Sequence, residues 1–123
     1  MPNNKELLKK LGFSAKENES DIFYKKYPSF GGYIIEADFQ KNKFDFGSKI
    51  KSDSGTTQNF SQEENWVVLE CVNRLLEKGY KPEDITLEKI YPTGHGTSGR
   101  LDILVKKNKR AYLMIECKTW GQE

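Results

Sequence analysis

The length, composition and charge of this sequence limit the classes of protein to which it can belong. Its 123 residues, 36% hydrophobic and 31% charged, suffice for one ordinary domain, or one with an appended piece. A net charge of +2, from 20 Lys and Arg against 18 Asp and Glu, argues against a simple polybasic nucleic-acid tail. A single histidine excludes any site built on several histidines, and no run approaches the ~18 apolar residues of a membrane span.

The N-terminus and the cysteines favour a cytoplasmic protein. The polar start Met1–Glu6 leads into a short helix rather than an apolar signal core. Cys71 and Cys117 form neither a metal-spaced cluster nor a disulfide framework, which suits a reducing cytosol. Both cysteines are expected to point into the core and to be inert. We therefore expect a cytoplasmic protein with no membrane partner.

Residues 1–60 are predicted to form an N-terminal helix, a β-hairpin and a linker. Leucines at helical spacing precede Gly12, which ends the helix. Aromatic and β-branched residues bounded by Gly and Asn indicate a small antiparallel unit; the segments are 22–24, 32–39 and 44–47. Ser, Thr, Asp and Lys residues over 48–60 indicate a linker or mobile loop. We expect this half to be a structural extension rather than an independent DNA-binding unit.

Residues 61–123 are predicted to fold as a helix followed by a three-stranded meander. Ser61 and Glu64 have the capping-box pattern, and Gly79 ends a helix that begins at about residue 62. Three apolar segments indicate the strands, which are 85–91, 101–105 and 111–118. The fold class is therefore α/β (α+β), with a helix and β-hairpin extension before the core.

Three charged side chains are expected to converge at the end of the last two strands. Alternation places Glu116 and Lys118 on one face of their strand, and a hairpin brings Asp102 beside them. Paired carboxylates at the rim of a sheet suit Mg²⁺, which would polarise a phosphate and lower the pKa of a bound water. Lys118 could orient that water or stabilise charge on the phosphate. The alternative is a surface salt bridge at a strand end.

The charge around these residues favours a phosphodiester substrate. From Lys89 to Lys118 there are seven basic residues, and Asp102 and Glu116 are the only acids. A basic surface whose carboxylates are candidate metal ligands fits a nucleic-acid backbone. The candidate DNA contacts are basic residues of this window and the histidine of the flexible loop over 92–99, namely Arg100, Lys106, Lys107, Arg110 and His95. For the histidine, the alternative is a plain solvent-exposed side chain.

Three stretches of the second half carry a resemblance to a known family, and they are Ser61–Trp66, Gly96–Val105 and Ala111–Gly121. They resemble the nuclease domain of the PD-(D/E)xK superfamily, in the form found at the N-terminus of type I restriction enzyme motor subunits and of restriction enzymes fused to an N6-adenine DNA methyltransferase. The resemblance implies a restriction-endonuclease-like core and metal-dependent cleavage of double-stranded DNA. It also implies downstream methyltransferase, motor or specificity domains in the same or a partner chain.

The resemblance also implies roles for individual residues. Asp102 and Glu116 would be Mg²⁺ ligands, with Mn²⁺ as a substitute, and Lys118 the catalytic lysine. The family often adds an acid from the first helix. Periodicity places Glu64 on the side of the helix that faces the sheet, and Glu70 on a mostly polar side with Trp66, Asn73, Arg74 and Glu77. Glu64 is therefore the better fourth catalytic candidate. It could equally be the carboxylate of the capping box, and the two roles are compatible.

The expected function is an Mg²⁺-dependent DNA endonuclease module of a restriction–modification enzyme. Two departures from the family pattern are visible. Leu101 stands before Asp102, where the family often has proline. Family members continue after the lysine strand with a helix and at least one more strand, so we expect 61–123 to be a C-terminally incomplete nuclease core. The alternative functions are a non-catalytic DNA-binding or structural module with the same fold, and a repair or recombination nuclease.

Overall fold

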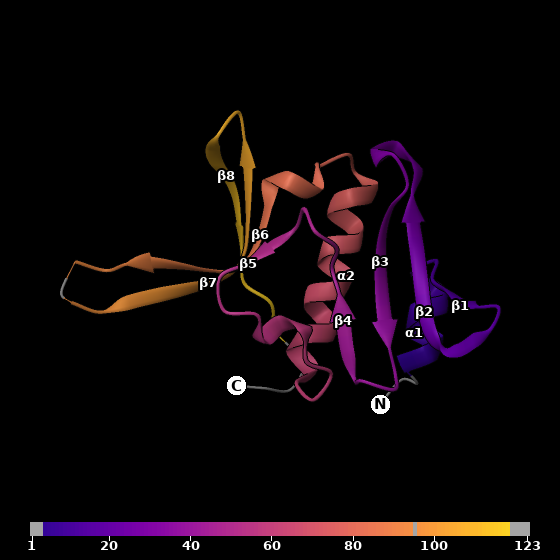
Figure 1. The fold of residues 1–123 in the computed structure, drawn as a ribbon. Coiled ribbons are helices and arrows are strands. Elements are labelled where there is room, and N and C mark those ends of the chain that lie inside the picture. Colours follow the sequence, from indigo (N-terminus) through magenta and orange to yellow (C-terminus); the bar gives the residue numbers. More distant parts are fainter. Residues whose placement is uncertain (1–3, 95, 119–123) are drawn as a thin grey trace.

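The computed structural model describes residues 4–94 and 96–118, and it consists of two four-stranded sheets with a central helix between them (Figure 1). The helices and strands are α1 (Asn4–Lys10), β1 (Ser14–Lys16), β2 (Glu19–Tyr27), β3 (Tyr33–Asp38), β4 (Lys43–Asp45), β5 (Lys51–Ser52), α2 (Glu63–Glu77), β6 (Ile85–Pro92), β7 (Ser98–Lys107) and β8 (Arg110–Ile115). Short 3-10 helices cover Pro28–Phe30, Thr56–Gln58 and Pro82–Asp84. The expected mixed α/β composition is confirmed. Neither α-helix of this described part has the length and apolar character needed to cross a membrane.

The first sheet has the strand order β1-β2-β3-β4, and every neighbouring pair is antiparallel. The antiparallel unit expected in this half is therefore present, with one strand more than the sequence pattern indicates. Strand β1 was not predicted, because its sequence Ser-Ala-Lys has no apolar alternation. Alternate residues of β2 and β3 turn one face of the sheet inward, where Phe23, Ile35 and Ala37 are buried.

The second sheet has the order β5-β6-β7-β8, and the β6-β7-β8 part is the predicted meander. A two-residue turn joins β7 to β8, in which Asn108 and Lys109 both have positive φ, as a type I′ hairpin turn requires. Four buried apolar residues alternate along β6 and β7 on the face toward the core, and they are Ile85, Leu87, Ile103 and Val105. These side chains join those of the first sheet in one hydrophobic cluster.

The segment 48–60, predicted above as a linker or mobile loop, is part of the second sheet and of the core. Its strand β5 pairs in parallel with β6, and Thr57 is buried. The Asn65 side-chain amide at the start of α2 donates hydrogen bonds to the carbonyls of Thr56 at 3.0 Å and Asn59 at 2.7 Å. These bonds hold the backbone of the segment against the start of α2. The division of the chain at residue 60 stays a prediction.

Helix α2 lies between the two sheets and is buried on both sides (Figure 1). Toward the first sheet, Trp66 packs edge-on against Phe44 with ring centroids 4.7 Å apart. On another side, Cys71 contacts Cys117, which follows β8. The expectation of a mostly polar helix side containing Trp66 and Asn73 is wrong, because that side faces the first sheet and both residues are buried. An amphipathic pattern with one apolar face does not describe a helix covered on two faces.

Of the two predicted ends of α2, the N-terminal capping box is not formed and the C-terminal end at Gly79 is. The capping box is wrong: the N-cap residue is Gln62, without a side-chain cap, so Ser61 lies one residue too early to bond the first turn. The predicted end at Gly79 is confirmed. Gly79 has a φ of 100°, and the N–H groups of Gly79 and Tyr80 bond to the carbonyls of Leu76 and Leu75. These two bonds form a Schellman motif.

A buried polar cluster joins α2 to the first sheet. The Asn73 side-chain oxygen accepts hydrogen bonds from the Tyr27 hydroxyl and from the Lys25 ammonium, both at 2.7 Å. Lys25 also donates to the Leu11 carbonyl at 2.6 Å and to Glu77 at 2.9 Å. Because buried polar groups are costly unless bonded, this cluster allows only one alignment of the helix on the sheet.

Replacing Asn73 by Leu should therefore destabilise the protein despite adding apolar volume. The variant leaves the buried Tyr27 hydroxyl without its acceptor and removes one of the three acceptors of Lys25, which should cost about 1–3 kcal/mol of unfolding free energy. Urea unfolding measures the difference. Arg74→Ala is the matched control on the next position of the helix, since its exposed pair with Glu70 should contribute less than about 0.5 kcal/mol. Equal stability of Asn73→Leu and the wild type would contradict this assignment.

Candidate functional site

Asp102 and Glu116 each lie one residue beyond the last pair of the β7–β8 ladder. That last pair joins Ile103 to Ile115. The strand predicted over 111–118 ends at Ile115, so 116–118 follows β8 as an extension outside the ladder.

One backbone hydrogen bond holds this extension against β7. The Cys117 N–H donates to the Asp102 carboxylate at 2.8 Å. This bond occupies one carboxylate oxygen of a partly buried aspartate, while Glu116 and Lys118 are exposed on either side of the buried Cys117. Between described residues, no ion pair joins Lys118 to Asp102 or Glu116, so the strand-end salt bridge considered above is absent.

Two carboxylates, those of Asp102 and Glu116, suit Mg²⁺ better than a metal that takes all of its ligands from protein side chains. Mg²⁺ is commonly held by one or two carboxylates, with water and substrate phosphate as the other ligands. Asp102 keeps one carboxylate oxygen clear of the Cys117 bond, and Glu116 is exposed next to it. Over 4–94 and 96–118 no group of three or more His, Cys, Asp or Glu side chains is gathered tightly enough to hold a metal. Glu64 therefore stays a predicted fourth residue.

The two cysteines lie beside this site and perturb each other. The Cys117 thiol donates to the Cys71 sulfur, with the sulfurs 3.9 Å apart, and this bond lowers the pKa of Cys71 to about 7. The same bond raises the pKa of Cys117, and burial and the carboxylates of Asp102 and Glu64 add to the rise. Glu64 is thus near enough to the motif for its charge to act on Cys117. The expectation that both cysteines are simple core residues holds for Cys117, whereas Cys71 is only partly buried.

Glu88 is a buried acid beside the site that the sequence interpretation missed. It lies on β6 between the ladder pairs Leu87–Ile103 and Lys89–Leu101, and so at the level of Asp102. Its φ is +50°, unusual for a residue with a side chain, and the residue is only 4% exposed. Its one sequence signal is its position directly before the basic window, next to the apolar run of β6.

The Glu88 carboxylate is satisfied by hydroxyl groups of the preceding segment. It accepts bonds from the side chains of Ser52, Ser54 and Thr56, and from the Thr56 N–H at 2.8 Å. Burial acts to raise the pKa of Glu88, but these bonds outweigh it, so the pKa lies below its usual value. Arg100 adds an ion pair at 3.7 Å while its side chain stays 56% exposed. Arg100 therefore keeps surface available for a DNA contact.

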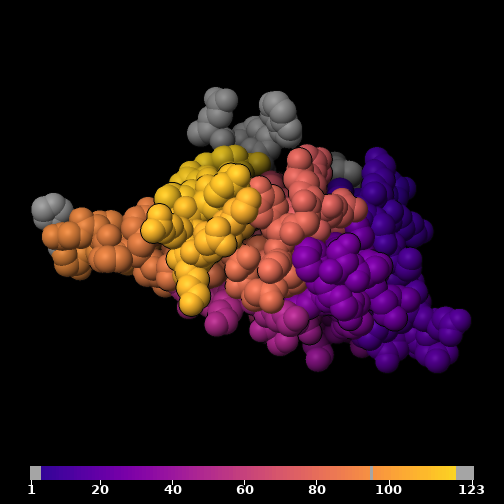
Figure 2. Space-filling model, turned by 90° about the horizontal axis from the view of Figure 1, so that it is seen from above, coloured from indigo at the N-terminus to yellow at the C-terminus, as the bar shows by residue number. Residues whose placement is uncertain are grey.

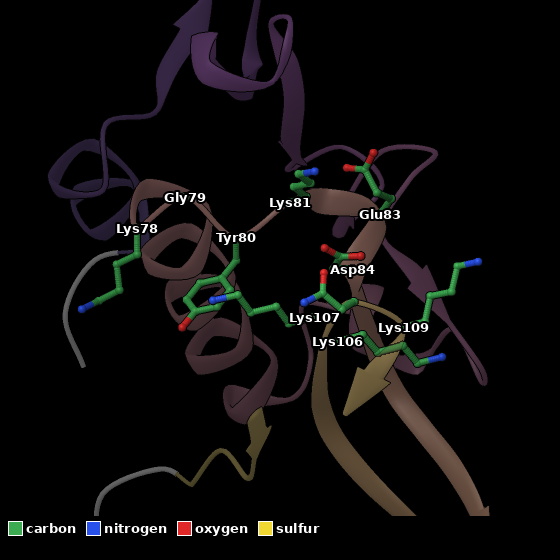
Figure 3. A pocket seen from close by; sticks show the side chains of 10 residues that line it. Lys78, Gly79, Tyr80, Lys81, Glu83, Asp84, Lys106, Lys107 and Lys109 are labelled. Carbon is green, nitrogen blue, oxygen red and sulfur yellow. The ribbon is translucent and has the colours of Figure 1, made fainter. Parts of the chain in front are cut away.

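A groove lined with lysines lies at the far end of the β7–β8 ladder (Figure 3). Its volume is about 740 Å³, and it lies between the segment after α2 and the β7–β8 turn. Its basic residues are Lys78, Lys81, Lys106, Lys107 and Lys109, and Glu83 and Asp84 are its acids. Across the described residues, Lys106, Lys107 and Arg110 take part in no ion pair. Lys106, Lys107 and Arg110 form a basic patch at this groove, whose five lysines outnumber its two acids.

The outer parts of β6 and β7 form an arm that projects from the body of the molecule (Figures 1 and 2). Pairing continues to Pro92–Ser98, so the loop expected over 92–99 is shorter than predicted. The Tyr91 ring lies against Gly99, where a Cβ would be 2.6 Å from the ring. Arg100 lies on the inner part of the arm. His95, a predicted DNA contact, is outside the described residues.

Comparisons with models of protein families, with curated proteins and with solved structures give no significant match for this chain.

Glu88→Gln should destabilise the protein in a pH-dependent manner. At pH 7 the change weakens several charge-assisted bonds of a buried carboxylate, and we expect a loss of about 2 kcal/mol. A lowered pKa in the folded state adds stability above the ordinary carboxyl value of 4.5, and this stability is lost as the pH falls through the folded value. The gap between wild type and variant should therefore narrow below pH 4.5 in urea titrations. Glu17→Gln, at an exposed turn, is the control, and a gap that widens in acid would refute the assignment.

Proposed function

We propose that this chain is an Mg²⁺-dependent DNA endonuclease module of a restriction–modification enzyme, which hydrolyses phosphodiester bonds. The observation that carries the proposal is the 2.8 Å hydrogen bond from the Cys117 N–H to the Asp102 carboxylate, which ties the segment containing Glu116 and Lys118 to Asp102. The order of helix α2 followed by the β6-β7-β8 meander agrees with a restriction-endonuclease-like core. This part of the proposal rests on the resemblance of the motif stretches.

The proposed roles follow from charge and exposure. Asp102 and Glu116 are the carboxylates that would hold Mg²⁺, which when bound polarises the scissile phosphate and acidifies a water molecule. The exposed Lys118 ammonium orients the attacking water or stabilises negative charge that develops on the phosphate. The Cys117 N–H fixes the orientation of the Asp102 carboxylate, as outer hydrogen bonds do for metal ligands generally.

The distribution of positive charge gives a route for the DNA backbone. Lys106 lies four residues from Asp102 along β7, a distance of ~13 Å. The groove and its lysines therefore lie within the length of a short duplex bound at the carboxylates, as does Arg100 on the arm. Double-stranded DNA is the proposed substrate, and methyltransferase, motor or specificity domains of the same or a partner chain are the proposed partners.

The alternative function is a non-catalytic module that uses the same surface to bind DNA or a partner domain. The exposed lysines and Arg110 suit either function. The carboxylate pair favours the nuclease, because two acids on a DNA-facing basic surface repel a phosphate unless a cation lies between them. A module that only binds DNA gains nothing from carboxylates that repel the phosphate backbone.

Replacing Asp102 by Asn should abolish DNA cleavage without unfolding the protein. The amide oxygen of Asn can still accept the Cys117 N–H bond, while the metal-binding charge is lost. We expect cleavage of supercoiled plasmid by the full-length protein to fall by about 10²-fold or more, and Lys118→Ala to have a similar effect. Glu19→Gln and Lys26→Ala are controls on the exposed surface of β2. Undiminished cutting by both site variants would eliminate the nuclease assignment.

Mg²⁺ titration of the same protein separates the two functions. Calorimetry on Glu116→Gln should show weaker Mg²⁺ binding than the wild type if the carboxylates hold the ion. A non-catalytic module predicts the same heat for both proteins and no cleavage by either.

Removing the basic patch should weaken DNA binding at every sequence. The triple variant K106A/K107A/R110A should lower the salt slope of duplex binding by about 0.9 for each phosphate that the variant no longer neutralises. Fluorescence anisotropy over a range of salt concentrations measures this slope. The control K9A/K10A removes two exposed lysines from α1, and it should leave the slope unchanged. Equal slopes for the triple variant and the wild type would place the DNA elsewhere.

A further inference from the structure

The two cysteines of the chain lie together although 46 positions separate them in the sequence. Cys71 belongs to helix α2, and Cys117 lies between the two charged residues of the proposed catalytic motif. Their sulfurs are 3.9 Å apart and both are free thiols. The nuclease role assigns nothing to this contact.

The distance between the sulfurs is short enough for a covalent bond after a small movement. A disulfide has a sulfur–sulfur length of about 2.05 Å, so the two atoms need to approach by roughly 2 Å. The extension 116–118 can supply this movement because β8 ends at Ile115 and the extension has left the ladder. Among the described residues, the extension is bonded to β7 through the hydrogen bond from the Cys117 N–H to Asp102.

The two thiols differ in how a reagent can reach them. Cys117 is 3% exposed, whereas Cys71 is only partly buried on the helix surface. A small oxidant therefore meets Cys71 first, and Cys117 is placed to react only with Cys71.

We propose that Cys71 and Cys117 are a modification site, which a low-molecular-weight disulfide such as oxidised glutathione converts into an intramolecular disulfide. Formation of this bond draws Cys117 toward α2 and away from Asp102, and it displaces Glu116 and Lys118 with it. Oxidation therefore lowers DNA cleavage, and this consequence rests on the proposed nuclease function. In a reducing cytosol the pair stays as thiols until oxidant accumulates, the usual behaviour of redox-sensing pairs.

The chemistry is a two-step thiol–disulfide exchange. The Cys71 thiolate attacks one sulfur of the reagent, forming a mixed disulfide and releasing one glutathione thiolate. The Cys117 sulfur then attacks the Cys71 sulfur, its proton passes to the departing sulfur, and the second glutathione is released as a thiol. The two protein thiols lose two electrons together, and the reagent is reduced to two thiols.

Mass spectrometry of the full-length protein treated with oxidised glutathione tests the modification itself. The wild type should lose two hydrogen atoms, yield a cross-linked Cys71–Cys117 peptide and keep no glutathione. Cys117→Ser should retain glutathione on Cys71, and Cys71→Ala should leave the buried Cys117 unreacted. Trp66 fluorescence confirms that each protein is folded before treatment. A folded wild type that keeps glutathione on Cys71, or that does not react, overturns the proposal.

Plasmid cleavage by the same samples tests the consequence separately. The oxidised wild type should cleave at least about tenfold more slowly than the reduced protein, and a reductant should restore the rate. Cys71→Ala should cleave equally well with and without oxidant. If the disulfide forms but cleavage is unchanged, the effect on the motif is wrong. If the reduced protein does not cleave at all, the nuclease function fails while the mass result still decides the modification.

Discussion

The burial of helix α2 between two sheets is the constraint on which the rest of the structure depends. Each sheet has an apolar face to cover, and the single helix covers both. Aromatic packing around Trp66 fixes the side of α2 that faces the first sheet. The polar cluster at Asn73 allows only one alignment of the helix on that sheet, because a shift would leave buried polar groups without hydrogen-bond partners. The helix in turn places Cys71 against Cys117. Contacts with the first sheet therefore position α2, and the contact of Cys71 with Cys117 in turn positions the segment after β8.

Of the three acids Glu88, Asp102 and Glu116, only two remain available for chemistry. Glu88 and Asp102 lie between the same two ladder pairs of β6 and β7, and Glu116 directly follows the last paired residue of β8. The charge of Glu88 is satisfied inside the protein by hydroxyl groups and by Arg100, so it is committed to holding the 48–60 segment. Asp102 gives one oxygen to Cys117, and Glu116 is exposed. Satisfying the innermost carboxylate lowers the repulsion that a third free acid would bring to the site.

Local rules explain which features could be predicted from the sequence. The antiparallel strands, the β6-β7-β8 meander and the end of α2 at Gly79 follow from alternation and backbone geometry within a few residues. The β7–β8 register up to Ile103 and Ile115 also follows, because a tight turn fixes hairpin register. The strand β5, the buried side of α2 at Asn73 and the role of Glu88 could not be predicted. Each depends on a partner distant in the sequence, which periodicity does not reveal.

The segment that carries the motif is attached to the rest of the protein by few described bonds. Ladder pairing stops at Ile115, so the segment 116–118 is positioned by a hydrogen bond to Asp102 and a thiol contact to Cys71. Segments held by few bonds open at low free-energy cost, and functional segments are commonly drawn from this class. The net contribution of one hydrogen bond to stability is about 1 kcal/mol, which is comparable with thermal energy. Loss of the bond to Asp102 or of the contact with Cys71 can therefore move the motif. The geometry of Glu116 and Lys118 therefore depends on other residues, and one of these is Cys117, which stands between them.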